Sequence, residues 1–391
     1  MAGARWVGFG AQVTEVLCRA YAAAYRRGSP AGSFDVLAQA VRQPALPVRF
    51  SKERREELEH AAMGLGPLRP QYGPGEVDVV APPDSEVDAT LREVEWLVRR
   101  RAGRLTLVKP AQVEPWSDRP RWTPAARVLV FDTLAEAWVR DVTFAGLSHL
   151  LLAMQRLRDC DGARHLARTG LRHTTGLTRL VALDEVAAPF PDPFMSGLEA
   201  KADGRGLGAW FARLMISFST VAAPMATARD DIKAQAVRLD HGVAGAGHAL
   251  LGLLRADECL AAKRVSMTPS VLARNRGAAL LRDAGLNPYR LAAKLCAAAP
   301  LPDPGPAAIS AQAEWLRRGD PFLADELSQA EKRAEELARE HGHAGTGTTH
   351  YLLALLEAPS ADPLLTACRV DPNDLRTRTA AALRAILTSS P

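Results

Sequence analysis

The sequence predicts a mainly α-helical protein, built as two lobes of paired four-helix repeats with a small mixed α/β insertion. Two observations carry this prediction. The first is a pattern in which small residues open a helix and a histidine precedes a leucine-rich face, seen at 147–152, 246–251 and 348–353. The second is that alanine and leucine, which favour helix, dominate an apolar set making up 47% of the chain. Such internal repetition is typical of stacked copies of one supersecondary unit.

Each of the three copies carries one histidine at the same place in the pattern: His149, His248 and His350. A fainter copy at 32–37 carries Asp35 in the same place. The histidines could serve as ligands or bases. Because one copy replaces histidine by aspartate, we expect instead that each packs at a helix start and hydrogen-bonds a nearby backbone carbonyl.

Differences in composition, and the positions of prolines and glycines, divide the chain into seven segments. We expect a divergent partial repeat at 1–46, a mixed insertion at 47–122, a repeat at 123–186, a linker helix at 187–222, a repeat with an insertion at 223–300, a proline-rich linker at 301–323 and the clearest repeat at 324–388. Within 47–122 the pattern predicts helices over 51–63 and 84–101 and short strands over 76–80 and 105–108. Prolines mark the turns around them.

The last repeat has the clearest element boundaries. Ala330, Ala334 and Leu337 fall on one helical stripe, which predicts a helix with one buried face. Glycines at 342 and 345 end that helix, and a threonine at 346 or 348 can cap the next. Asp-Pro pairs at 362–363 and 371–372 are typical of helix starts. Four short helices follow from this spacing.

Composition and charge exclude several classes of protein. The net charge of +5 is spread over 391 residues, and the 42 arginines (against 7 lysines) are interleaved with acids, so we expect no specific nucleic-acid binding. No leader sequence or membrane span is apparent, and the five cysteines form no CxxC pair, so we expect a cytoplasmic protein with reduced thiols. Cys160 lies between two aspartates, which disfavours its thiolate and a catalytic role.

The last repeat resembles a known family. Its motifs are Ala330-x3-Ala334-x2-Leu337, Gly342-His343-Ala344-Gly345-Thr346, His350-x-Leu352-Leu353-x-Leu355-Leu356 and Val370-Asp371-x-Asn373-Asp374-Leu375. They closely resemble the Clp N-terminal (Clp R) repeat, the helical domain in front of Clp-type AAA+ unfoldases. The likeness is weaker in the second and third repeats and faint in the first. It implies four-helix repeats that pack as pseudo-twofold pairs and bind adaptor proteins, substrates or cyclic peptides.

Two departures limit what the resemblance implies. The phosphate-loop motif G-x-x-x-x-G-K-[ST] is absent from the sequence, and Thr348 stands where the loop at 342–347 would need its lysine. The glutamate that often precedes the family's histidine, and that grips phosphorylated arginine in related modules, is also absent. The matching residues are Phe34, Ser148, Gly247 and Thr349. We therefore expect neither ATP hydrolysis nor phosphoarginine binding.

The candidate functional residues indicate a binding surface rather than a catalytic site. His341, His343 and His350 together could hint at a metal site. Two histidines at i and i+2 do not share a helix face, however, and no cysteine lies close in sequence, so we expect no metal. No catalytic constellation and no cofactor motif is recognisable. In the family a groove forms between paired repeats at the starts of the first two helices. The corresponding positions here are Thr123, Thr143, Phe144, Ser148, Thr346, Thr348 and Thr349. Their hydroxyls and amides could hold a peptide or an anion, or could simply cap helices. Phe144 would add an apolar anchor if it is exposed.

We therefore expect a non-catalytic module that binds a protein or peptide, as an adaptor, decoy or sequestering protein linked to Clp proteolysis. One alternative is an enzyme whose site uses acids of the 47–122 segment, such as Asp78, Asp84, Glu86 or Asp88. Another is an arginine-rich DNA-binding regulator, which strong salt dependence would reveal. The oligomeric state and the partner are left open.

Overall fold

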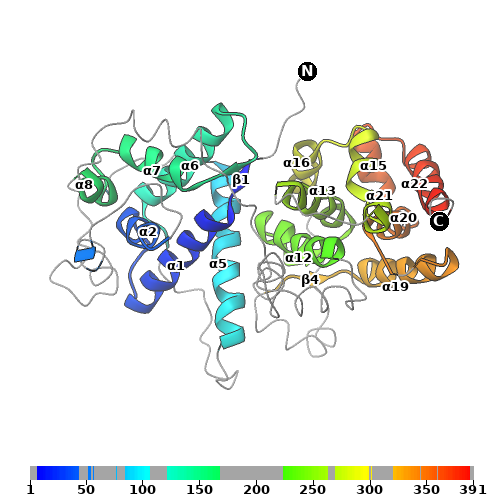
Figure 1. The fold of residues 1–391 in the computed structure, drawn as a ribbon, viewed down its shortest axis with the longest axis horizontal. Helices are drawn as coiled ribbons and strands as arrows, with labels where there is room; N and C mark the ends of the chain where they lie inside the picture. The colour runs from blue at the N-terminus through cyan, green and yellow to red at the C-terminus, as the bar shows by residue number, and fades with distance from the viewer. Residues whose placement is uncertain are drawn as a thin grey trace. The chain divides into compact units, whose positions relative to one another are not determined.

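The computed structural model describes residues 7–43, 52–53, 56, 76, 84–105, 121–167, 223–262, 269–298, 301, 320–343, 345–358 and 360–387. The chain separates into two compact units, which we call the N-terminal unit (Arg5–Pro189) and the C-terminal unit (Phe190–Pro391, with Met1–Ala4). The described residues form fifteen helices and four strands of two residues each (Figure 1). The prediction of a mainly α-helical protein is confirmed.

The described residues of the N-terminal unit form two helix pairs, one long helix and one short helix. Its described elements are β1 (Gly8–Phe9), α1 (Ala11–Arg27), α2 (Ser33–Ala40), α5 (Ser85–Leu105), α6 (Pro124–Val139), β2 (Phe144–Ala145), α7 (Leu147–Arg156) and α8 (Asp161–Ala167). α1 packs on α2, α6 packs on α7, and α5 lies along α1. The core takes leucines from both pairs, among them Leu17, Leu37, Leu129 and Leu150.

The described part of the 47–122 segment differs from the prediction in its strands. Glu76 and Leu105, each expected to begin a strand, are both helical, and Leu105 is the last residue of α5. The predicted helix over 84–101 is present as α5. Asp84 caps this helix, because its Oδ1 accepts the backbone N–H groups of Glu86 at 2.8 Å and Val87 at 3.1 Å. The remaining residues of both predicted strands lie outside the described part of the chain.

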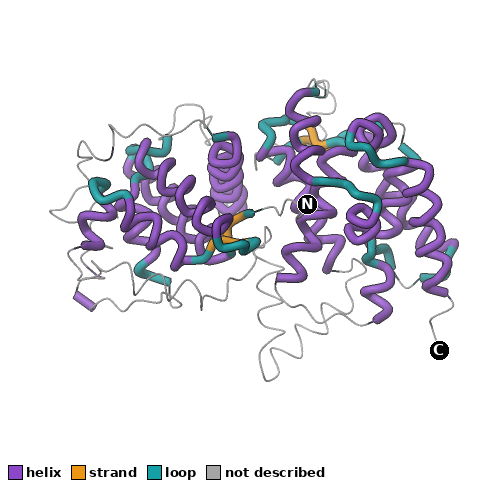
Figure 2. The backbone as a smooth tube through the Cα atoms, turned by 90° about the horizontal axis from the view of Figure 1, so that it is seen from above, coloured by secondary structure: helices purple, strands orange, loops and turns teal. Residues whose placement is uncertain are grey.

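Short parallel strand pairs tie the repeats of each unit together (Figure 2). In the N-terminal unit β1, which precedes α1, pairs with β2, which lies between α6 and α7. Trp122, just before α6, in turn bridges to Ala31, between α1 and α2. Each repeat therefore pairs its leading segment with the segment between the first two helices of the other. This exchange is the reciprocal arrangement expected of a pseudo-twofold pair.

The C-terminal unit repeats the same plan. Its described elements are α12 (Ala223–Arg238), β3 (Val243–Ala244), α13 (Ala246–Ala262), α14 (Pro269–Arg274), α15 (Gly277–Asp283), α16 (Pro288–Ala297), β4 (Phe322–Leu323), α19 (Asp325–Glu340), α20 (Thr348–Leu356), α21 (Ala361–Ala367) and α22 (Pro372–Leu387). β4 pairs with β3 in the parallel sense. The segment expected to be a linker at 301–323 thus ends in a strand that helps to join the two repeats.

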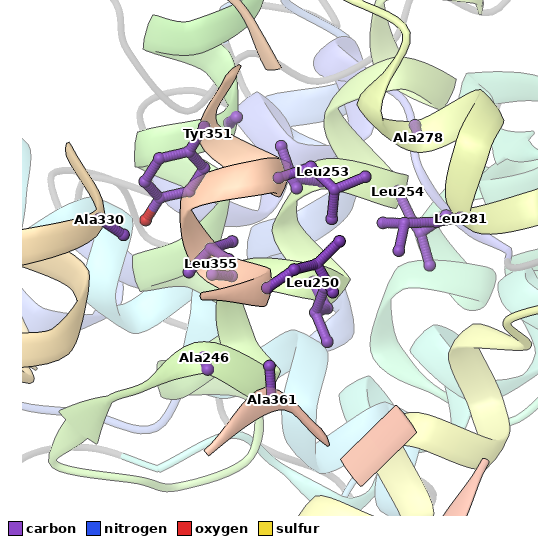
Figure 3. Packing of buried hydrophobic residues seen from close by; sticks show 14 of the residues in the cluster. Ala246, Leu250, Leu253, Leu254, Ala278, Leu281, Ala330, Tyr351, Leu355 and Ala361 are labelled. Carbon is purple, nitrogen blue, oxygen red and sulfur yellow. The ribbon is translucent and has the colours of Figure 1, made fainter. Parts of the chain in front are cut away.

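One core runs through both repeats of the C-terminal unit. Leu250 and Leu254 of α13, Leu281 of α15, and Tyr351 and Leu355 of α20 are all at most 2% exposed and belong to one cluster (Figure 3). The predicted stripe of α19 points into the same cluster. The two repeats therefore bury part of their apolar surface against each other. None of the helices in the described part of the chain is long and apolar enough to cross a membrane.

Candidate functional site: the joints between paired repeats

The repeated histidine is a helix-capping acceptor. Its Nδ1 accepts the backbone N–H of the N-cap glycine three residues earlier. The donor–acceptor distances are 3.1 Å for Gly146 and His149, 3.0 Å for Gly245 and His248, and 3.1 Å for Gly347 and His350. Asp35 does the same with its Oδ2, at 3.0 Å from the N–H of Gly32. The fourth copy therefore keeps the acceptor while changing the residue, as a capping box requires.

This geometry corrects the expected partner of the histidines. We expected a backbone carbonyl, to which a ring N–H would donate, whereas the partner found is a backbone amide, which needs an unprotonated ring nitrogen. His248 and His350 place their Nε2 atoms 2.9 Å and 2.7 Å from the Nδ1 atoms of His241 and His343. With Nδ1 as acceptor, the neutral rings carry the proton on Nε2 and donate it to the second histidine.

Burial keeps these rings neutral. His248 and His350 are 3% and 0% exposed. Desolvation first, and the neighbouring His241 second, lowers the pKa of His248 to about 4. Desolvation first, and His343 second, lowers the pKa of His350 to about 3. The capping bond works in the same direction, because a protonated Nδ1 has no lone pair for the glycine N–H.

The carboxyl group of Asp35 has a cationic neighbour, whereas His248 and His350 each contact a second histidine. Its Oδ1 lies 2.7 Å from Nη2 of Arg27, and its side chain is fully buried. Burial raises the pKa of Asp35 to about 6, although the Arg27 guanidinium pulls that pKa downward. The first repeat thus replaces a neutral imidazole with a carboxyl group next to a guanidinium.

A second buried carboxylate lies at the joint between the repeats of the N-terminal unit. Glu76 is 0% exposed. Its Oε1 accepts from the N–H of Ser33 at 2.6 Å and from the Thr123 hydroxyl at 2.7 Å. Its Oε2 accepts from the Ser33 hydroxyl at 2.5 Å and from the N–H of Asp161 at 3.1 Å. Four donors from α2, from the cap of α6 and from the start of α8 therefore converge on one side chain.

The C-terminal unit has an equivalent joint with a neutral acceptor. Thr348 begins α20 as Ser33 begins α2, and its N–H donates to Oδ1 of Asn275 at 2.9 Å. The N–H of Gly277 donates to the Thr348 hydroxyl at 3.2 Å, just as the N–H of Gly162 donates to the Ser33 hydroxyl at 2.9 Å. The insertion expected within the 223–300 repeat supplies Asn275, directly after α14.

Two glycines allow the close approach at these joints. A Cβ on Gly162 would lie 2.7 Å from the carbonyl oxygen of Ser33, and a Cβ on Gly277 would lie 2.6 Å from that of Thr348. Both distances are shorter than real Cβ atoms show. The sequence carries a matching signal at both joints, the Gly-Ala pairs at 162–163 and 277–278.

The predicted groove residues of the N-terminal unit line this joint or the core instead of an open surface. Thr123 is 3% exposed and also caps α6, accepting from the N–H of Ala126 at 3.2 Å. Thr143 is half-buried, and its carbonyl accepts from the N–H of Gly8 at 2.9 Å. Ser148 is 0% exposed, and Phe144 is 3% exposed within β2. Phe144 could act as an apolar anchor only if it were exposed, and this condition is not met.

The predicted groove residues of the C-terminal unit are placed in the same way. Thr348 and Thr349 are 6% and 0% exposed. The Thr349 hydroxyl accepts from the N–H of Arg276 at 2.9 Å. Thr346 is half-buried beside them. The hydroxyls of Thr348 and Thr349 therefore accept bonds from the start of α15, across the joint between repeats.

Other side chains that could bind a metal or take part in catalysis have structural roles or unfavourable surroundings. No cluster of three or more metal-ligating side chains occurs among the described residues. Burial raises the pKa of the Cys160 thiol, which disfavours the nucleophilic thiolate. Of the acids in the alternative enzyme hypothesis, Asp84 caps α5 and Asp88 forms an ion pair with Arg127. Glu86 is half-buried in α5, and Asp78 lies outside the described residues.

With this geometry established, the comparison with protein families assigns the last repeat. Residues 323–391 match the Clp repeat (R) N-terminal domain. The match begins in β4 and covers α19 to α22, so the resemblance inferred from the motifs is confirmed for the C-terminal end of the chain. No curated protein matches the sequence. A Clp R domain is a helical, Clp-related protein-interaction module, and this class applies to residues 323–391.

Proposed function

We propose that this chain is a non-catalytic protein-binding module, which engages a protein or peptide of the Clp proteolytic machinery or one of its substrates. The match of residues 323–391 to the Clp R domain carries this proposal. In this role the chain acts in the cytoplasm as an adaptor, a decoy or a sequestering protein. The absence of a phosphate-loop motif from the sequence supports a module that binds without its own unfolding motor.

The burial and hydrogen bonding of the repeated histidines and threonines support the proposal that the chain is non-catalytic. A general base needs a pKa near the working pH and access to its substrate. His248 and His350 have neither, because their pKa values lie at about 4 and about 3 and both rings are buried. The hydroxyls of Thr348 and Thr349 accept bonds across the joint between repeats. Because these groups are bonded within the chain, we expect the partner to bind the outer helical surfaces of the repeats.

The test is a binding and degradation assay with purified components. We expect the full chain to bind a Clp-type unfoldase, or a known adaptor of one, in a saturable manner. An adaptor would accelerate degradation of a client by the unfoldase–protease complex, and a decoy or sequestering protein would slow it. No binding to unfoldase, adaptor or degradation substrate would contradict the proposal, as would ATP hydrolysis by the chain alone.

Two variants connect the binding to the folded C-terminal unit. Leu281→Asp places a charge in a fully buried core position and should abolish binding. Glu335→Ala removes an exposed side chain on α19 and should fold normally. Binding that survives Leu281→Asp would assign the interaction to a different part of the chain.

A further inference from the structure

Each repeat fixes one further residue at the end of its first helix. In all four repeats the backbone turns there through a residue with positive φ, and the next residue donates its N–H to the carbonyl five positions earlier. This closure is the Schellman motif of helix C-termini. The residues that donate are Ser29, Val142, His241 and His343. The two repeats of the C-terminal unit therefore carry a histidine where the other two carry serine or valine.

In the last repeat this histidine completes a series of hydrogen bonds, which we call the histidine relay. The N–H of Gly347 donates to Nδ1 of His350 at 3.1 Å, and Nε2 of His350 donates to Nδ1 of His343 at 2.7 Å. His241 and His248 repeat the arrangement in the preceding repeat, with 2.9 Å between their nitrogens. His350 is 0% exposed, whereas His343 is only half-buried. The relay thus connects a buried helix cap to a ring that protons from solvent can reach.

A proton on His343 breaks the histidine relay. The charged ring carries an N–H on both nitrogens, so its Nδ1 becomes a donor that faces the Nε2–H of His350. His350 relieves this conflict by moving its own proton to Nδ1, after which its Nε2 accepts a charge-assisted hydrogen bond from His343. The new Nδ1–H of His350 then faces the N–H of Gly347, and the cap of α20 is lost.

The titratable and charged neighbours of His343 are His341, Arg274 and His350. The ring of His341 stacks on that of His343, with 5.7 Å between the ring centroids. Arg274 belongs to α14 of the preceding repeat and also donates from Nη1 to the carbonyl of Gly345 at 3.3 Å. Burial first, and then His341 and Arg274, lower the pKa of His343 from the ordinary 6.5. The ring is therefore neutral at neutral pH and takes up its proton only in acid.

The cap that the relay holds lies at the joint between the repeats. Gly347 is so close to α14 that a Cβ on it would lie 2.3 Å from the carbonyl oxygen of Arg274. The next residue, Thr348, donates its N–H to Oδ1 of Asn275 at 2.9 Å. When the start of α20 loses its cap, these contacts across the joint are loosened with it.

We propose that His343 is an acid sensor of the C-terminal unit, whose protonation releases the cap of α20 and loosens the joint between the repeats while the unit stays folded. His350 passes the change from the half-buried ring to the buried cap. In the N-terminal unit Ser29 and Val142 stand at the corresponding positions, and neither side chain titrates in this range. The inference depends on the hydrogen bonds of the C-terminal unit and is independent of the proposed function.

Native-state hydrogen exchange of the ¹⁵N-labelled full chain tests the proposal. The readout is the protection of the Gly347 amide, corrected for the intrinsic exchange rate, as the pH falls below 6.5. It should fall more steeply in the wild type than in His343→Asn, by about tenfold per pH unit, because the opened His343 takes up a proton that the closed ring resists. The asparagine Oδ1 can still accept from His350 but does not titrate.

Two controls separate this local opening from other effects of acid. The amide of Leu355, within α20, reports unfolding of the whole unit, so the comparison uses the pH range in which Leu355 is at least tenfold better protected than Gly347. His341→Asn removes a titratable neighbour of His343 but leaves the histidine relay intact, and it should keep the steep wild-type dependence.

Ring ¹H–¹⁵N spectra of the wild type give a second readout that needs no substitution. As the pH falls, protonation of His343 should be accompanied, with the same midpoint, by a proton on Nδ1 of His350. If His343→Asn fails to fold, this titration decides alone. Equal slopes for Gly347 in the wild type and His343→Asn, or a protonated His343 beside a His350 whose Nδ1 is still an acceptor, would overturn the proposal.

Discussion

Acidification should destabilise the C-terminal unit, because two of its buried histidines must stay neutral to cap their helices. His248 and His350 have pKa values of about 4 and about 3 in the folded chain, against 6.5 for an ordinary histidine. Below that ordinary value the unfolded chain binds protons that the folded chain does not, so the free energy of unfolding falls as the pH falls. For each histidine the loss is complete only once the pH drops below its folded pKa.

The size of the effect follows from the pKa differences. Between neutral pH and pH ~5, each histidine of the unfolded chain is titrated over about 1.5 pH units below its ordinary pKa, while the folded rings remain neutral. At about 1.4 kcal/mol per unit this amounts to about 2 kcal/mol for each ring, and to about 4 kcal/mol for both. Such a loss is a large fraction of the stability of a typical domain.

The double variant His248→Asn/His350→Asn isolates this contribution. The Oδ1 atom of asparagine can take the place of Nδ1 as the capping acceptor, and the amide does not titrate. Urea unfolding followed by far-UV circular dichroism should show a weaker pH dependence in the double variant than in the wild type. Leu281→Ala, which removes no titratable group from the buried core, is the control and should keep the wild-type pH dependence. Equal pH dependence in the double variant and the wild type would refute the reasoning.

Two substitutions and one labelling experiment test packing and thiol chemistry. Gly277→Ala, whose Cβ would lie 2.6 Å from the Thr348 carbonyl oxygen, should lower the free energy of unfolding by about 1–3 kcal/mol, and an unchanged urea midpoint would contradict the close approach. Leu281→Ala, at a position that is 0% exposed, should cost about 2–5 kcal/mol in the same assay, and a loss well under 1 kcal/mol would show that the position is not core. In the native chain a thiol reagent should modify the exposed Cys296 and leave Cys160 untouched until urea unfolds the protein, whereas fast labelling of Cys160 would place it at the surface.

The helices could be predicted because their signals are local. The apolar stripe of α19 and the repeated pattern at the start of each second helix both depend on residues within two turns of each other. Ala334, for example, was expected inside and is 0% exposed. The strands could not be predicted in the same way. β1 to β4 have two residues each, too few to show alternation, and their pairing joins residues more than 70 positions apart.

The site was harder to predict than the fold for a similar reason. Local spacing indicates that a threonine can cap a helix, but not that a distant acceptor will bury it. Glu76 lies in a proline- and glycine-rich stretch with no pattern that would single it out. For the histidines, spacing placed them correctly at the helix start. It could not distinguish a carbonyl partner from an amide, because either contact fits the same sequence.

The most direct test of the account is the protonation state of the three repeated histidines, read by ¹H–¹⁵N correlation spectra of their rings at neutral pH. If His149, His248 and His350 cap their helices, each Nδ1 is the unprotonated acceptor and each neutral ring carries its proton on Nε2. Added zinc should leave these signals unchanged. Protonated Nδ1 atoms, or signals that move with zinc, would contradict the claim that the repeated histidine is structural.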